Sequence, residues 1–294
     1  MSAEKRTSLW AVCLGCVLLL VGPGCKSPGL PQAGAEGAEP AWTPDSVPFG
    51  PSQGGPAQQP QAGPLVSLVV TFDLLRIEVA AGAISTSQTL WNHLDEEAVG
   101  SERALLLRRN GFRVGLGQPG AWPAVEAILG ASQPVLSRRK VLSLRGPQPV
   151  SIEDGQAPRD QTVFYYRGDG TLVGQSLADS RNLLRVDHQV EPASPEAVVL
   201  QVTPIVYQTD LGLQWLRTAA GLEKVPAYDG LAIEDLSFRV RLPAGCFLLI
   251  ASGPEAVRPG LIGREVMSAA GREGRYEFIY VIWARVIRTE VQPG

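Results

Sequence analysis

The sequence contains few of the residues that usually carry catalysis or bind metal ions. It has two histidines and four cysteines among its 294 residues. Cys13, Cys16 and Cys25 all lie in the first 25 residues, so the rest of the chain contains Cys246 alone. A lone thiol cannot close an intrachain disulfide. We therefore expect a buried core, rather than disulfide bridges, to stabilise the folded part.

Positive charge is also sparse and is not clustered. The chain carries 26 Lys and Arg against 29 Asp and Glu, which gives a formal net charge of −3 at pH 7. Proteins that bind nucleic acids usually show a basic stripe or patch, and no such run is present. We expect no nucleic-acid partner.

Motifs for nucleophilic catalysis and for phosphate binding are missing as well. The sequence has no Gly-x-Ser-x-Gly, and its glycine-rich stretches have no phosphate-loop lysine. Cys246, at the start of an apolar segment, is typical of a small buried hydrophobe. The expectation is a protein that is not an enzyme and holds no cofactor.

Both histidines have a structural and a functional interpretation. His93 is followed by Asp95 and Glu97, which could offer metal ligands, but a solvated helix end is the favoured reading. His188 lies among apolar residues of a predicted strand, and we expect it on the exposed face. A hydrolase built from the scattered carboxylates stays open as an alternative, because the fold sets the geometry of such a site. The candidate carboxylates are Asp73, Glu78, Asp95 and Glu97.

The first 25 residues have the pattern of an export signal. Lys5 and Arg6 precede an apolar run at residues 9–21, and Gly22-Pro23-Gly24-Cys25 follows. The run is too short for a stable membrane-spanning helix, which needs about 20 residues. The segment resembles a bacterial lipoprotein signal, although Pro23 departs from the usual pattern. The resemblance implies that Cys25 is lipidated and becomes the first residue of the mature chain; ordinary cleavage near Gly24 and a retained anchor are the alternatives.

Residues 26–64 are rich in proline and glycine and have no apolar period. Such a segment cannot bury enough surface to offset the entropy lost on ordering. We expect it to be a disordered tether between the membrane and the folded part.

Residues 65–133 predict a small α+β unit. An apolar, β-branched segment at residues 65–79 is typical of a strand. Asn110-Gly111 ends a predicted helix, because glycine adopts the left-handed conformation at low cost, and Pro123 suits the first turn of another. The expected elements are a strand at 65–79, helices at 89–95, 101–109 and 123–129, and a strand at 112–116. The first of these helices follows a capping-box pattern at residues 85–88.

Residues 134–294 predict a mainly antiparallel β-rich domain. Gly168-Asp169-Gly170 indicates a hairpin turn between two strands. In residues 278–287 the even-numbered and the odd-numbered positions are both mainly apolar. We therefore expect that strand to be central and covered on both faces, with Trp283 buried. A helical turn is expected near residues 211–220. The predicted strands are 135–144, 149–153, 161–167, 171–176, 182–190, 196–208, 235–242, 246–252 and 276–289.

Residues 198–287 resemble the C-terminal part of bacterial secretins, the ring channels of secretion and pilus systems. Residues 198–206, which contain Thr203-Pro204, resemble the strand of that family that ends in a Thr-Pro pair, and Pro259-Gly260-Leu261-Ile262-Gly263 is similar to its Pro-x-Leu-Gly turn. The chain departs from the family at Ala251-Ser252 and at Trp283-Ala284-Arg285, and residues 208–235 are too few for the gate hairpins. The resemblance implies a secretin-like β-fold used as an envelope module, without a pore of its own, and it carries over no functional residue.

Together these patterns predict an α+β protein of the bacterial cell envelope that is anchored in a membrane through Cys25 and faces the periplasm or the exterior. A binding or structural role is the leading hypothesis. A subunit of a secretin-like ring, which would be a homo-oligomer or hold an envelope partner, and a hydrolase of envelope polymers are the alternatives.

Overall fold

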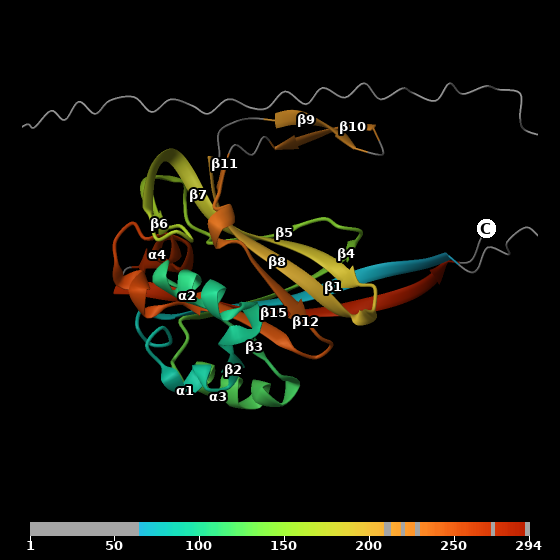
Figure 1. The fold of residues 1–294 in the computed structure, drawn as a ribbon, viewed down its shortest axis with the longest axis horizontal. Helices are drawn as coiled ribbons and strands as arrows, with labels where there is room; N and C mark the ends of the chain where they lie inside the picture. Colours follow the sequence, from blue (N-terminus) through green and yellow to red (C-terminus); the bar gives the residue numbers. More distant parts are fainter. Residues whose placement is uncertain (1–64, 209–212, 219–220, 227–229, 272–273, 292–294) are drawn as a thin grey trace, which may run out of the picture. The chain divides into compact units, whose positions relative to one another are not determined.

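The computed structural model describes residues 65–208, 213–218, 221–226, 230–271 and 274–291. The expected signal, including Cys25, and the expected tether at 26–64 lie outside the described residues. The described residues all belong to one compact unit, Pro60–Gly294. They form two antiparallel sheets, a separate hairpin and short helices (Figure 1). The fold is therefore mostly antiparallel β structure, which the label α+β describes only roughly.

The first sheet joins strands from both ends of the described chain. Its order is β2-β3-β13-β15-β1-β4, and β14 also pairs with β15. β15 therefore lies between β13 and β1, while β2 and β4 form the two edges. The strands are β1 (Leu65–Ala80), β2 (Leu94–Asp95), β3 (Phe112–Gly117), β4 (Leu136–Arg145), β13 (Phe247–Ser252), β14 (Ser268–Gly271) and β15 (Gly274–Val291).

The second sheet is built around β7 and β8. Its order is β11-β8-β7-β5, with β12 also paired to β8 and β6 to β7. β7 is a single long strand, where the sequence predicted two, because its first half pairs with β6 and its second half with β5 and β8. The strands are β5 (Val150–Glu153), β6 (Arg159–Tyr166), β7 (Leu172–Glu191), β8 (Ser194–Gln208), β11 (Gly230–Ala232) and β12 (Phe238–Leu242).

The hairpin turn predicted at residues 168–170 is confirmed. It joins β6 to β7, and the backbone N–H of Arg167 donates to the carbonyl oxygen of Thr171 at 2.9 Å. The helical turn expected near 211–220 is wrong for residues 213–218, which form β9 (Leu213–Thr218) and pair with β10 (Gly221–Pro226). Local patterning missed this hairpin because the sequence between its strands, Ala219-Ala220, is not a typical hairpin turn pair.

Two of the three predicted helices are confirmed with close boundaries. They are α2 (Ser101–Arg109), which ends before Gly111 at a φ of 82°, and α3 (Trp122–Ala131). The helix predicted at 89–95 is shorter, α1 (Gln88–Trp91), and Ser87 makes no side-chain capping bond. Its expected last residues instead form β2, because Leu94 pairs with Gly117 in the sheet. One short helix was not predicted, α4 (Ile262–Met267).

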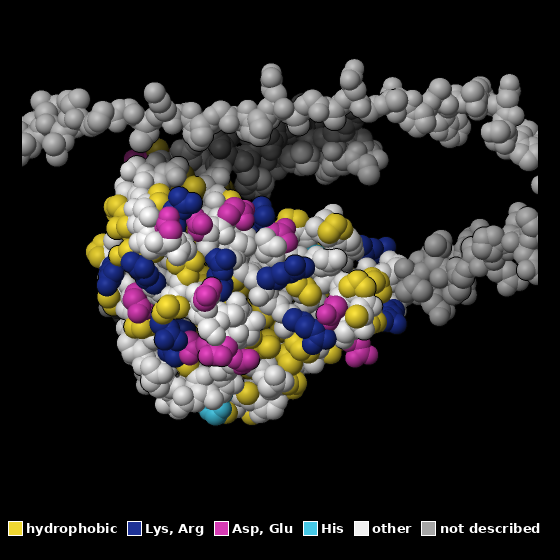
Figure 2. Space-filling model, in the orientation of Figure 1, with side chains coloured by type: hydrophobic (Ala, Val, Ile, Leu, Met, Phe, Trp, Pro, Cys, Tyr) yellow, Lys and Arg dark blue, Asp and Glu magenta, His cyan; other side chains and the backbone are white. Residues whose placement is uncertain are grey.

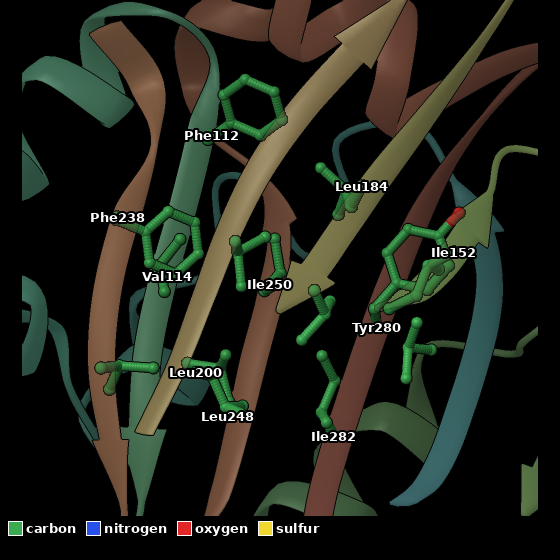
Figure 3. Close-up of a cluster of buried hydrophobic side chains, with 14 of the residues drawn as sticks. Phe112, Val114, Ile152, Leu184, Leu200, Phe238, Leu248, Ile250, Tyr280 and Ile282 are labelled. Carbon is green, nitrogen blue, oxygen red and sulfur yellow. The ribbon is translucent and has the colours of Figure 1, made fainter. Parts of the chain in front are cut away.

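The larger core lies between the two sheets (Figure 3). The first sheet contributes Phe72, Val114 and Ile250, and the second contributes Leu184 and Leu200. Residues two apart on a strand share a face, so the residues of β15 that enter this core are all even-numbered. They are Phe278, Tyr280, Ile282 and Ala284.

A second core fills the opposite face of the first sheet, under α1 and α3. Ile279 and Val281 of β15 pack there with Leu90 and Trp91 of α1 and with Val125 of α3. β15 is thus central in its sheet and covered on both faces along residues 278–282, as its sequence predicts. For residues 283–287 the prediction of cover on both faces is wrong, because Arg285 and Ile287 are exposed.

The structure does not separate residues 65–133 from residues 134–294 as two bodies. β1 pairs along its whole length with β15, and β4 pairs with β1 across the expected boundary. The two segments therefore share one sheet and both cores.

The expectation that His188 is exposed is wrong. Its side chain is 8% exposed, and its ring meets that of Phe72 edge to face at 5.0 Å between centroids. The strand period explains this position, since His188 has the same parity as the buried Leu184 and Val186. Burial lowers the pKa of His188, although a hydrogen bond with the backbone of Gly146 opposes the shift.

Candidate functional site

The face of the first sheet that carries α1 and α3 is only partly covered by these helices. Beyond them β1 and β15 run on together, as Figure 1 shows. Side chains of β1, β4 and β15 are open to solvent on this part of the face, including Val141 at 60% and Ile287 at 48% exposure. We call this the open face; it is defined by Thr71, Asp73, Ser137, Arg139, Val141, Trp283, Arg285 and Ile287.

A hollow of about 520 Å³ lies where the open face meets α3. Trp122 and Glu126 line it from the helix, and Asp73, Arg139 and Trp283 line it from the sheet. A second hollow of about 180 Å³ adjoins it and shares Asp73 and Trp283. Trp283 therefore lies between the two hollows.

Aromatic packing holds Trp283 in place. Its ring centroid lies 4.7 Å from that of Trp122 and 5.9 Å from that of Phe247. Phe247 is fully buried, whereas Trp283 is half-buried. The expectation that Trp283 is buried thus holds for one side of the ring, and the other side faces the hollows.

An ion pair lies beside this ring. Arg139 donates to both carboxylate oxygens of Asp73, and its Nε lies 2.7 Å from Oδ1. This hydrogen bond raises the pKa of the Arg139 guanidinium above its ordinary value. The guanidinium carbon also lies 5.8 Å from the Trp283 ring centroid, close enough for a cation–π contact. The hollow therefore presents an aromatic surface with the Arg139–Asp73 ion pair at its rim.

Cys246 lines the larger hollow from the side of β13. Its side chain is buried, and its thiol donates to Oε1 of Gln118 at 3.4 Å. Burial raises the pKa of the thiol, so it stays protonated at neutral pH. This geometry agrees with the prediction of a small buried hydrophobe and gives no reactive thiolate.

The structure does not bring the four candidate carboxylates together. Asp73 lies in the hollow, but Glu78 has the opposite parity on β1 and pairs with Arg76 at 2.7 Å. Asp95 accepts the backbone N–H of Glu97 at 2.9 Å. Sequence reasoning missed Glu126, which α3 places near Asp73 in the hollow. Its contact with the open face depends on tertiary packing, so no local pattern signals it.

Neither histidine joins a cluster of possible metal ligands. His93 is exposed beyond α1, and His188 is buried between the sheets. Within the described ranges, no three His, Cys, Asp or Glu side chains gather in a way that could hold a metal ion. Among these same residues, no helix has the length and apolar character needed to cross a membrane.

Charges of both signs are interspersed on the surface shown in Figure 2. Lys and Arg side chains lie next to Asp and Glu over most of the visible described surface. On this face the charges form no large patch of a single sign.

Comparisons with known proteins give little further information. No family model matches the chain, and no curated protein does either. Solved structures that it resembles include the type IV competence pilus secretin PilQ of V. cholerae, at 14% identity and a TM-score of 0.20 over 77% of this chain and 60% of that one. The InvG secretin domain of the Salmonella SPI-1 injectisome gives 11% identity and a TM-score of 0.17 over 78% and 63%.

A third structure, the Klebsiella pneumoniae type II secretion system outer membrane complex, gives 10% identity and a TM-score of 0.17 over 77% of this chain and 39% of that one. The first two of these structures are secretins, the family that residues 198–287 resemble in sequence. The chain spans less than two thirds of each matched chain. TM-scores this low carry no argument about fold or function, so the secretin resemblance stays a prediction.

Proposed function

We propose that this chain is a binding protein of the bacterial cell envelope that is tethered to a membrane through Cys25 and holds a protein partner on its open face. The export pattern at residues 1–25 supports the location, and the low-complexity segment at 26–64 supports the tether. The open face supports the binding role.

The observation that carries this proposal is the half-buried Trp283 between two hollows. Aromatic side chains supply much of the binding energy of protein interfaces when they are rigidly held and surrounded by a polar rim. Trp122 and Phe247 hold Trp283 from one side, while Arg139 and Asp73 form a charged rim. The groups around the hollow favour binding over catalysis, because Cys246 is protonated and Asp73 is already paired with Arg139.

Site-specific photo-crosslinking in living cells tests this role. A photo-reactive amino acid at Ile287, on the open face, should form an adduct with a partner that mass spectrometry can identify. The same amino acid at Leu105, which is 67% exposed on α2, is the matched control and should give no such adduct. The Ile287 adduct should weaken in a Trp283→Ala background. Equal adducts from both positions, or none from Ile287, would overturn the proposed binding role.

The same experiment separates this proposal from the ring-subunit alternative. An adduct between two copies of the chain at Ile287 would show that the open face joins identical subunits. An adduct with a different envelope protein supports the binding module.

A further inference from the structure

Strand β4 leaves one long side of the first sheet unpaired. Among the described residues it pairs with β1 alone, and its ten residues span the edge next to the open face. The backbone N–H and C=O groups on its outer side are the groups with which an added strand forms hydrogen bonds.

The charges along this edge have one sign. Arg138, Arg139, Lys140 and Arg145 lie on β4, and the strand contains no Asp or Glu. Arg139 is paired with Asp73, whereas the other three form no ion pair with any described residue. This edge is locally basic on a chain whose formal net charge is −3.

Hollows flank the edge on both of its faces. The Trp283 hollows lie on the side of α3. On the other side a hollow of about 550 Å³ opens between β4 and β5. Its walls include the core residues Ile152, Tyr280 and Ile282, close to one another in Figure 3. Arg138 and Lys140 line it from β4, and one acid, Glu153, lines it from β5.

We propose that the free edge of β4 binds an extended, acidic segment of a partner protein as an added antiparallel or parallel strand. The backbone of the segment extends the first sheet. Its alternate side chains enter the Trp283 hollows on one face and the β4–β5 hollow on the other, and its carboxylates pair with Arg138, Lys140 and Arg145. This inference names the partner chemistry for the proposed function and rests on that proposal.

The charge pattern disfavours a second copy of the chain as the occupant. Two β4 strands side by side would bring together two strands that each carry four cations and no acid. If they paired antiparallel about Arg139, Arg138 of each copy would lie opposite Lys140 of the other. Like charges directly opposite each other destabilise a strand pair. Basic side chains also protect an edge from unspecific pairing, so the edge favours a segment with complementary charge.

Fluorescence anisotropy with a labelled peptide tests the inference. The probe is a ten-residue peptide of alternating Glu and Val, and the control peptide alternates Lys and Val. The full-length chain in detergent should bind the acidic peptide at least about tenfold more tightly than the basic one, and added salt should weaken binding. Failure to bind the acidic peptide, or equal binding of both, would overturn the inference.

Matched variants locate the binding. Replacing both Arg138 and Lys140 by Glu should weaken acidic-peptide binding by about tenfold or more. The control is the same exchange at Arg239 and Arg241, two exposed cations with the same spacing on β12, which also pairs with a single strand of its sheet. Arg241 is paired with Glu191 at 2.6 Å, so urea unfolding must show that this variant is folded. Equal loss in both variants would show unspecific charge attraction and contradict the inference. The neutral exchange of Arg138 and Lys140 to Gln repeats the test if the Glu variant does not fold.

The peptide-binding test of the β4 edge and the crosslinking test of the proposed function can fail independently. A partner crosslinked from Ile287 together with no acidic-peptide binding would remove the inference about β4 and leave the binding role. Acidic-peptide binding without any crosslink from Ile287 would leave the β4 edge as a peptide site and remove the proposed role of the open face.

Discussion

The rings of Trp122 and Trp283 meet edge to face, with centroids 4.7 Å apart and planes inclined by 81°. Trp122 begins α3 and Trp283 lies on β15, so this contact joins a helix to the central strand of the first sheet. It also marks the point where the helices stop covering the sheet and the open face begins.

Two aromatic truncations should separate packing from binding. Phe247 is fully buried, and Phe247→Ala should lower the free energy of unfolding by about 3–5 kcal/mol. Trp283 is half-buried, so Trp283→Ala should cost less, about 2 kcal/mol, because it removes less buried surface. Urea unfolding measures both. A loss at Trp283 as large as that at Phe247 would indicate that Trp283 serves mainly the core.

His188 should make stability depend on pH. Its folded-state pKa is lowered by burial, so the unfolded state binds more protons as the pH falls below the ordinary value of about 6.5. The stability associated with neutral His188 is therefore present above about pH 6.5 and is lost as the pH falls through the lower, folded-state pKa. The urea midpoint should drop over this window in the parent and drop less in His188→Gln.

His93 provides the control for this titration. His93→Gln makes the same exchange at an exposed histidine outside the two cores. Burial raises the pKa of Asp154, so this residue makes the free energy of unfolding fall as the pH rises, which is opposite to the effect of His188. Asp154 is present in the parent and in both variants, so it does not affect the comparison between them. Identical pH profiles for His188→Gln and His93→Gln would contradict the assignment to His188.

Two glycine substitutions should have opposite effects. A Cβ on Gly263 of α4 would lie 2.3 Å from the carbonyl oxygen of Asn110 and 2.4 Å from the carbonyl carbon of Gly111. Gly263→Ala should therefore cost about 1–3 kcal/mol, since backbone atoms must move. A Cβ on the exposed helical Gly130 would meet no atom within 4 Å, and Gly130→Ala should add about 0.5–1 kcal/mol. Thermal unfolding tests the pair, and a neutral Gly263→Ala would show that α4 can shift away from α2.

Lipidation can be tested directly at Cys25. If Cys25 is acylated, Cys25→Ala should lose palmitate labelling and leave the membrane fraction, because the acyl chains contribute about 0.8 kcal/mol per buried methylene. Cys246→Ala is the matched control and should keep both properties, since Cys246 is buried in the fold. A Cys25→Ala chain that still fractionates with membranes and still incorporates palmitate would show that another residue is modified.

Local sequence signals identified several elements correctly. Gly111 and Pro123 mark an end of α2 and the start of α3, because each residue has a strong backbone preference. The turn at residues 168–170 was recognisable for the same reason. The parity of His188 with Leu184 was also present in the sequence, and applying the strand period to it would have predicted its burial.

The sequence by itself determined that residues 278–282 are buried on both faces. Their even-numbered and odd-numbered side chains are all apolar, and exposing either set to water costs free energy. The sequence did not determine the open face or the free edge of β4. Those depend on the pairing of β1 with β15 and β4, and on how far α3 extends over the sheet. Strand pairing between distant segments and the contact of a helix with a sheet are set by side-chain packing over the whole fold, so only the tertiary structure decided which residues surround Trp283.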